Sequence, residues 1–144
     1  MNFRQRNDTN RGSAMNSHSV GNNFHMFDES ALLLNRLMAM SMQRHQTIAG
    51  NIANVNTPGY KRRVFNFEAA MREAILNGDL DKALQIRGEV TIDEQSPARP
   101  DGNNVRMEEE SNLLLMNSLE HQLYTRALQK KIQILKLAIS GGRG

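Results

Sequence analysis

The stretch Asn51-Ile52-Ala53-Asn54-Val55-Asn56-Thr57-Pro58-Gly59-Tyr60-Lys61 stops a long helical pattern and begins a tight turn. Pro58 suits the second position of a turn, where a φ of about −65° is needed. Gly59 suits the third position of a type II turn, where φ is positive. Because Thr57 precedes a proline, its backbone is pushed out of the α region. The sequence therefore predicts a turn that starts at Thr57, with the helix ending at or before Asn56.

Three asparagines mark this helix end: Asn51, Asn54 and Asn56. Asparagine is a poor helix former, but its amide can bond the carbonyl groups that a helix leaves unpaired in its last turn. We expect these side chains to bond the carbonyls at the end of the helix.

A heptad-like pattern precedes the turn. Asp28 or Ser30 can cap its start, and Glu29 lies near the positive end of the helix dipole. Mostly apolar residues then alternate at spacings of three and four, as in a helix that packs lengthwise against another helix. These residues are Ala31, Leu34, Met38, Ser41, His45, Ile48, Ile52 and Val55. The pattern predicts a long helix within residues 27–56.

A second long helix is predicted over residues 105–144. Glu108, Glu109 and Glu110 come first, where negative charge complements the helix dipole, so we interpret them as a helix start rather than a metal or acid–base site. Two apolar stripes follow. One contains Met116, Leu119 and Leu123, and the other contains Tyr124, Leu128, Ile132 and Leu135. A two-helix hairpin needs only one seam per helix, so the wide apolar surface predicts contacts with other subunits.

Weaker patterns occupy residues 57–104. We predict a short helix from Glu68 to Leu76 capped by Asn66, a second short helix within residues 79–86, and a short strand over residues 90–92. The basic triplet at residues 61–63 is interpreted as a solvated face. We expect this central segment to be flexible and weakly structured.

The predicted fold class is mainly α, with long N- and C-terminal helices packing as an α-hairpin or coiled coil. The polar residues 1–26 are expected to form a disordered tail, because they cannot bury enough surface to offset the entropy of ordering. We predict an assembly interface made of two sets of residues. One set is Leu34, Met38, His45, Ile48 and Ile52, and the other is Met116, Leu119, Leu123, Tyr124, Leu128, Ile132 and Leu135.

Composition excludes several classes of function. The chain has 144 residues, room for one domain, and contains no cysteine, which removes disulfides and thiolate metal sites. His45 and His121 lie without the neighbours that a metal or catalytic site needs. No apolar run approaches the roughly 18 residues of a membrane span, and no signal-peptide pattern is visible. We expect no catalytic residues, no cofactor, no metal and no small-molecule substrate.

The turn stretch resembles the N-terminal motif of the flagellar axial proteins, the family of rod, hook and hook-associated subunits. A second block, Asp101-Gly102-Asn103-Asn104-Val105, together with the C-terminal helix, resembles the short proximal rod subunits. The resemblance implies a structural subunit of the periplasmic rod that is exported by the flagellar type III apparatus. The partners it implies are other rod subunits, the rod-to-ring adaptor, the inner-membrane ring protein and further copies of the chain in a helical assembly.

Other interpretations stay open on the residues alone. The chain could be another short rod subunit of the same family, or a generic helical adaptor that forms closed coiled-coil dimers. A nucleic-acid partner is not expected, because the net charge is only +3 and no dense basic block with interleaved aromatics occurs. A small enzyme finds no support in the motifs.

Overall fold

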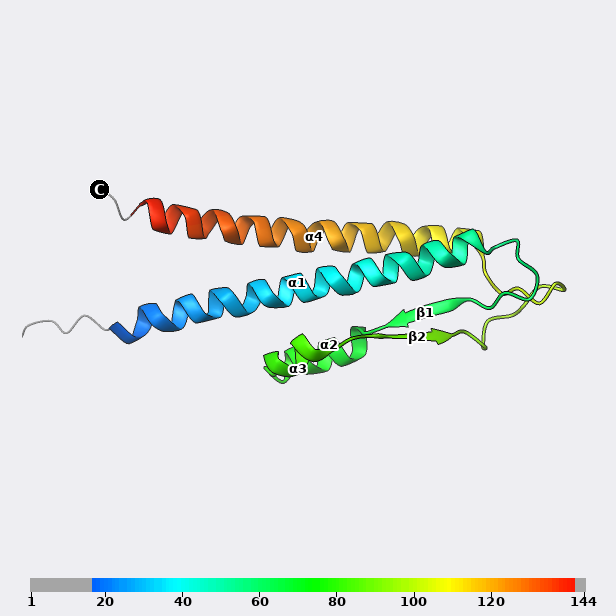
Figure 1. Ribbon diagram of the computed structural model, residues 1–144, viewed down its shortest axis with the longest axis horizontal. Helices are drawn as coiled ribbons and strands as arrows, with labels where there is room; N and C mark the ends of the chain where they lie inside the picture. The colour runs from blue at the N-terminus through cyan, green and yellow to red at the C-terminus, as the bar shows by residue number, and fades with distance from the viewer. Residues whose placement is uncertain (1–16, 142–144) are drawn as a thin grey trace, which may run out of the picture.

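Two long antiparallel helices and a small central module make up the part of the chain that the structure describes (Figure 1). The computed structural model describes the backbone of residues 17–141 and the side chains of residues 29–141. The long helices are α1 (Ser17–Ala53) and α4 (Met107–Ser140). The module contains β1 (Arg63–Asn66), α2 (Glu68–Leu76), α3 (Leu80–Gln85) and β2 (Glu89–Ile92). The predicted mainly α fold with long terminal helices is confirmed.

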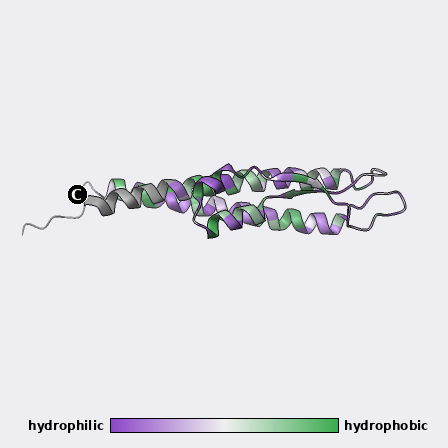
Figure 2. Ribbon diagram, turned by 90° about the horizontal axis from the view of Figure 1, so that it is seen from below, coloured by the Kyte–Doolittle hydropathy of each residue, from purple (hydrophilic) through white to green (hydrophobic). Residues whose placement is uncertain are grey.

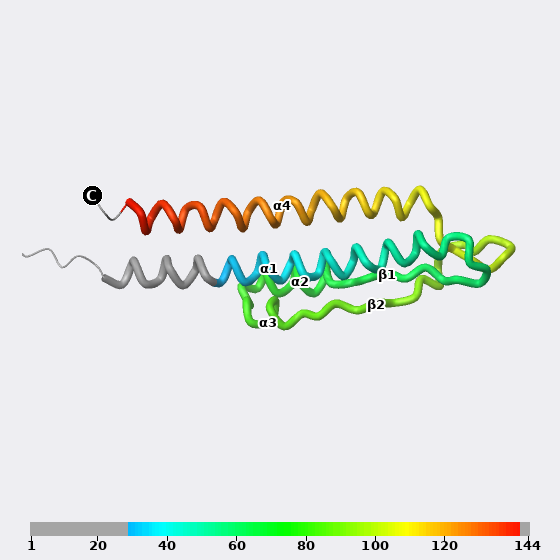
Figure 3. Tube along the Cα trace, turned by 45° about the horizontal axis from the view of Figure 1, so that its top comes forward, coloured from blue at the N-terminus to red at the C-terminus, as the bar shows by residue number. Residues whose placement is uncertain are grey.

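Helix α1 is the middle layer of the molecule. Figures 1 and 3 both show α4 along one side of α1 and the central module along the other. The start of α1 and the end of α4 lie at one end of the hairpin, and the loops before β1 and before α4 lie at the opposite end. This layering leaves the side of α4 that faces away from α1 uncovered by the rest of the described chain.

The boundaries of α1 match the prediction at one end only. The helix ends at Ala53, before the predicted limit. It begins at Ser17, well before Asp28, so α1 includes residues 17–26 of the segment that was predicted to be a disordered tail. Extending an existing helix is much easier than nucleating one, so a polar stretch without proline can continue it. The rest of the predicted tail, residues 1–16, lies outside the described residues.

The central module has more secondary structure than predicted. Strands β1 and β2 pair antiparallel, with Arg63 opposite Ile92 and Asn66 opposite Glu89. The two short helices and the strand at residues 90–92 are confirmed, but β1 was missed. Asn66 does not cap α2, because its Nδ2 donates to Thr91 Oγ1 at 2.8 Å, across the strand pair.

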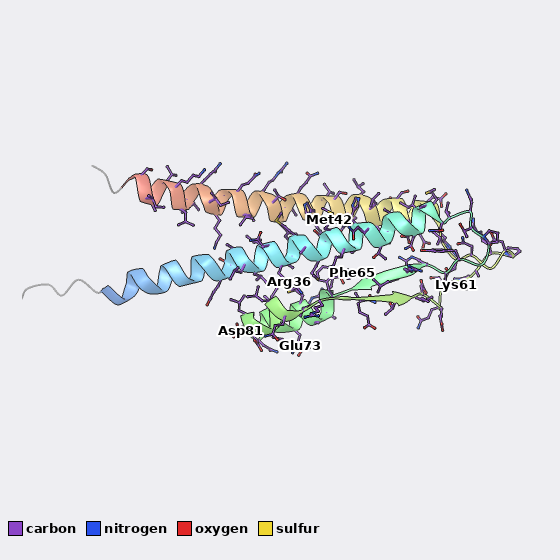
Figure 4. The ribbon with its side chains drawn as sticks, viewed as in Figure 1. Arg36, Met42, Lys61, Phe65, Glu73 and Asp81 are labelled. Atoms are coloured by element: carbon purple, nitrogen blue, oxygen red, sulfur yellow. The ribbon has the colours of Figure 1, made fainter. Side chains whose placement is uncertain are left out.

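The hydrophobic core lies between α1 and this module. It consists of Met40, Phe65, Phe67, Met71, Ala74 and Ala83. Figure 4 shows Phe65 between β1 and α1, and Arg36 of α1 on the same side, where its guanidinium donates to the Ile86 carbonyl. The Phe65 ring also packs directly on Gly88, which has φ +70°. The core therefore fixes the module against α1 and leaves α4 free on its far side.

Hydrophilic and hydrophobic residues are interspersed along the elements (Figure 2). Among the described residues, no helix combines the length and the apolar character that crossing a membrane requires.

Candidate assembly surface

A buried polar junction joins α1 to the start of β1 and to α4. Its centre is Asn51, which is fully buried. Asn51 Oδ1 accepts a hydrogen bond from the Arg63 backbone N–H at 2.9 Å, and Asn51 Nδ2 donates to the Arg63 carbonyl at 2.8 Å. The same Nδ2 donates to Glu110 Oε2 at 3.0 Å. One amide therefore satisfies the backbone of β1 as a neighbouring strand would and links it to α4.

Glu110 is fully buried and is balanced by Arg62. Arg62 Nε donates to Glu110 Oε1 at 2.5 Å, and its Nη1 donates to Asp93 Oδ2 at 3.1 Å. Burial disfavours the charged Arg62, but its hydrogen bonds and charge interactions with Glu110 and Asp93 outweigh that effect and raise the pKa of the guanidinium. The interpretation of the basic triplet as a solvated face is therefore wrong for Arg62.

Asp93 is the second carboxylate that forms an ion pair with Arg62. The hydroxyl and backbone N–H of Ser96 donate to the Asp93 carboxylate, and together with Arg62 they lower its pKa from 3.8 to about 2. Asn104 completes this layer: its Oδ1 accepts from the Arg62 backbone N–H at 2.7 Å, and its Nδ2 donates to the Asp93 carbonyl at 2.7 Å. The junction thus joins segments from both halves of the chain.

The predicted turn is confirmed. Tyr60 N donates to the Thr57 carbonyl at 3.2 Å, and Gly59 has φ +71°. The Gly59 N–H points outward from the turn and donates to the Asp101 carbonyl at 2.8 Å. Pro58 is exposed at the tip. The turn is therefore fastened to the loop that precedes α4.

Asn103 holds the segment between the end of α1 and the turn by bonding three of its carbonyls. Its Nδ2 donates to the carbonyls of Asn54 and Thr57, both at 2.9 Å, and of Val55 at 3.2 Å. Of the three asparagines expected to do this, Asn54 bonds a helix carbonyl, that of Gly50, at 2.8 Å. The Asn51 side chain instead bonds the backbone of Arg63 in β1. Asn56 is exposed, and within the described part of the chain no hydrogen bond involves its side chain.

A second polar cluster lies halfway along the hairpin. Asn117 of α4 is buried, donates to the Ser41 carbonyl at 2.9 Å and accepts from Arg44 Nε at 2.7 Å. Ser41 Oγ lies 2.7 Å from His121 Nδ1. Arg44 also forms ion pairs with Glu68 and Glu120. Buried polar pairs within a helical seam specify one register, so this cluster and the junction both fix how α1 and α4 align.

Most residues of the predicted assembly interface pack inside the hairpin. On α1 they share a face with Ser41, whose partners are on α4. Of these, Ile48 is buried and Leu34, Met38, His45 and Ile52 are half-buried. On α4, Tyr124, Leu128 and Leu135 are half-buried and share a face with Asn117, while Ile132 is exposed beside them.

Helix α4 has a second apolar face that points away from α1. We call it the outer face and define it by Met116, Leu119, Leu123, Ile134 and Leu137. These side chains are 44–69% exposed. At 3.6 residues per turn they lie on the other side of the helix from Asn117 and His121, which contact α1. An exposed stripe of this size is typical of a protein–protein contact.

Comparison with known proteins agrees with these features. A family model described as flagella basal body rod protein matches residues 35–61, the segment that ends in the turn. The flagellar basal body rod protein FlgB of Aeromonas hydrophila is 30% identical over 126 residues, which cover 80% of this chain and 96% of that protein. The chain belongs to the FlgB family of flagellar basal body rod proteins. FlgB of Borrelia hermsii is 32% identical over 118 residues, covering 69% of this chain and 87% of that protein. FlgB of Escherichia coli is 27% identical over 118 residues, covering 69% and 85%.

Membership in the FlgB family makes the chain a structural rod subunit, as the resemblance implied, and the family is not an enzyme family. In residues 29–141, no three histidine, aspartate or glutamate side chains are grouped as metal ligands would be. Within the segment matched by the family model, Asn51 bonds Glu110, and the carbonyls of Asn54 and Thr57 accept hydrogen bonds from Asn103. The motif residues Asn51, Asn54 and Thr57 therefore make contacts within the chain.

Proposed function

We propose that the chain is incorporated into the flagellar rod through the outer face of α4, while the polar junction holds the hairpin in the shape that this contact requires. The observation that carries the proposal is the exposed apolar outer face of α4, which Arg126 and Lys130 divide into one part from Met116 to Leu123 and another from Ile134 to Leu137. Apolar side chains on one side of a helix gain free energy when another helix covers them. The inner side of α4 is already occupied by α1, so the outer face is the part of α4 that can receive a neighbour.

The junction has a supporting role in this proposal. It contains buried charge and several buried amides, and leaving any one of them unpaired is costly. The hairpin therefore has one favourable register, and α4 is presented at one angle to its neighbours.

The proposal extends to the surroundings of the subunit. They are the other rod subunits, the rod-to-ring adaptor and the inner-membrane ring protein, in the periplasmic rod, after export through the flagellar type III apparatus. Family membership supports this part, since the relatives are named as flagellar basal body rod proteins.

The test replaces one outer-face residue by a charge. Leu123→Asp is expressed in a flagellated species whose own copy of the protein has been deleted, with the parent chain as the positive control, and the amount of the variant in isolated basal bodies is measured together with the recovery of swimming. We expect loss of both, with normal helical circular dichroism of the purified chain. Leu76→Asp on α2 is the matched control, because Leu76 is 78% exposed and lies off the outer face. Normal incorporation of Leu123→Asp would contradict the proposal.

A further inference from the structure

A small cavity lies between α1 and α4, beside the second polar cluster. Its volume is about 250 Å³, and three of the side chains that line it carry a nitrogen or sulfur lone pair: Met42, His45 and His121. Figure 4 shows Met42 on α1, next to α4. The expectation of no metal was based on each histidine alone on its own helix. The pairing of α1 with α4 brings both histidines to one cavity together with a thioether.

The hydrogen bonds around Ser41 fix the tautomer of His121. Ser41 Oγ lies 2.8 Å from the Met38 carbonyl and 2.7 Å from His121 Nδ1. A carbonyl can only accept, so the single hydroxyl hydrogen of Ser41 is donated to Met38. Ser41 Oγ therefore accepts from the Nδ1–H of His121, which leaves a lone pair on Nε2. Histidines that bind metals are commonly held in this way, with one ring nitrogen donating to a protein oxygen and the other bound to the metal.

The His45 ring completes a pair with His121. It is half-buried, and within the described part of the chain no hydrogen bond or ion pair involves it. Helical side chains lean toward the N-terminus of their own helix. Because α1 and α4 are antiparallel, His45 leans along the seam toward Ser41, while His121, beside Ser41, leans toward Asn117, beside Arg44. The two rings therefore approach each other from opposite ends of the cavity that both line.

The chemistry of the lining determines which metal fits. Among the described residues, the lining contains no carboxylate, whereas Ca²⁺ and Mg²⁺ are held by carboxylates and other oxygen ligands. Imidazole suits several transition metals, and a thioether is a soft ligand that favours Cu(I). Imidazole and thioether are both neutral, and neutral ligands hold a singly charged ion at lower electrostatic cost than a doubly charged one. Two imidazoles and one thioether therefore match Cu(I) best.

We propose that this cavity binds one Cu(I) ion through the imidazoles of His45 and His121 and the thioether of Met42, with His121 coordinating through Nε2. Only the closed hairpin brings these ligands together, so binding stabilises the hairpin relative to the unfolded chain. A group of three histidine or carboxylate ligands is absent from residues 29–141, so the thioether is an essential part of the site. The site is separate from the outer face and does not depend on the proposed function.

Titration of the purified chain with Cu(I) tests the site, under anaerobic conditions with ascorbate as reductant and bicinchoninate as a coloured competitor. We expect the parent chain to withdraw one equivalent of Cu(I) from the competitor, and its melting temperature to rise by about 5 °C or more. His45→Asn, His121→Asn and Met42→Leu should each weaken binding by about tenfold or more, since losing a ligand costs at least as much as losing an outer partner. Parent-like binding by any one of them would overturn the site.

The substitutions are chosen to leave the hairpin intact. His121→Asn keeps an N–H where Nδ1–H donates to Ser41 and removes the Nε2 lone pair. Met42→Leu conserves volume at a position that is 49% exposed. Circular dichroism without copper should therefore match the parent chain for all three variants. If His121→Asn fails to fold, His45→Asn and Met42→Leu still test the site.

His18 and His25 provide the matched control, because they are the other two histidines of the chain. The double variant His18→Asn, His25→Asn should bind Cu(I) as tightly as the parent. Loss of binding in the double variant, with retention in His45→Asn, would place the copper elsewhere and overturn the proposal.

Nitrogen NMR of the imidazoles tests how His121 coordinates, because Cu(I) is diamagnetic and leaves the spectrum readable. We expect the Nε2 resonance of His121 to shift on addition of Cu(I) while Nδ1 stays protonated. Coordination through Nδ1, or no change at either nitrogen when copper binds, would overturn the proposed geometry.

Discussion

Asn51 of α1 and Glu110 of α4, 59 positions apart in the sequence, are joined by a 3.0 Å hydrogen bond between two completely buried side chains. Asn51 belongs to the turn stretch, and Glu110 follows the block that holds Asn103. The two stretches that carried the family resemblance thus meet at one place in the fold. Because both side chains are buried and hydrogen-bonded, a single substitution that leaves one of them unpaired should lower the stability of the hairpin.

Asn51→Asp should destabilise the hairpin by about 3 kcal/mol, because it removes the donor and sets a second carboxylate against the buried Glu110. Urea unfolding followed by circular dichroism measures the change. Asn56→Asp makes the same chemical change at an exposed position of the same stretch and should cost less than about 0.5 kcal/mol. Equal effects of the two variants would show that the junction does not stabilise the chain.

Stability should fall in acid as Asp93 takes up a proton. Its pKa is lowered from 3.8 to about 2, so its contribution is present above pH 3.8 and is lost as the pH falls toward 2. The difference corresponds to about 2 kcal/mol. We expect Asp93→Asn to be less stable than the parent chain at pH 5 and to lose less stability between pH 4 and pH 2. Parallel stability curves for the two chains would contradict this assignment.

Gly59→Val should weaken rod incorporation more than it affects solubility, because a β-branched residue resists the φ of +71° on which the turn depends. The cost should be about 2 kcal/mol or more. Gly50→Ala is the control within the same segment: Gly50 is helical, and an added Cβ meets nothing within 4 Å. It should stabilise α1 by about 0.5–1 kcal/mol. Normal incorporation of Gly59→Val would show that this turn geometry is not required.

Gly88→Ala should separate the central module from α1. The added Cβ would lie 2.3 Å from Phe65 Cζ, and the φ of +70° also disfavours alanine. Displacing a core ring should cost about 2–3 kcal/mol. The near-ultraviolet circular dichroism of Phe65 and Phe67 should weaken along with stability. Gly78→Ala has a similar φ but open space around it, so it isolates the backbone contribution from the clash.

Leu128→Asp and Leu123→Asp should have different effects although they lie on one helix. Leu128 is half-buried on the side of α4 that contacts α1, so a carboxylate there should lower stability by about 2–3 kcal/mol. Leu123 is 63% exposed, and its replacement should change stability by less than about 1 kcal/mol. Thermal unfolding of the purified chains measures both. A large loss for Leu123→Asp would show that the outer face is covered within the chain.

Local chemistry made part of this fold predictable. The turn at Thr57, the end of α1 and the short helix from Glu68 to Leu76 depend on residues close in sequence, and the structure has them where predicted. Strand β1 was not predictable in this way. Its residues form a strand because Asn51 and β2 supply the hydrogen-bond partners, and neither partner is adjacent in sequence.

The role of Glu110 was missed although a signal existed. Glu110 is in the same heptad row as Asn117, Tyr124 and Lys131, the row of α4 that faces α1. A carboxylate in that row requires a partner, and Arg62 is the one that the fold brings to it. Charge complementarity at a helix start applies equally to Glu108, Glu109 and Glu110, but only the Glu110 side chain is buried and bonded to Asn51 and Arg62.

The distance along the chain between the halves of the junction determines when the hairpin can close. The Asn54 carbonyl is bonded by Asn103, and the Asn51 amide is bonded to Glu110. Neither hydrogen bond can form while only the first hundred residues are available. Until then the inner face of α1 has no α4 to cover it. Bringing together segments so far apart in the sequence costs loop-closure entropy, and the contacts that offset this cost form only afterwards. The pairing of α1 with α4 should therefore be a late and slow step of folding. In a chain that emerges with its N-terminus first, the core between α1 and the central module can therefore form early, but the side of α1 that contacts α4 stays uncovered until α4 has followed.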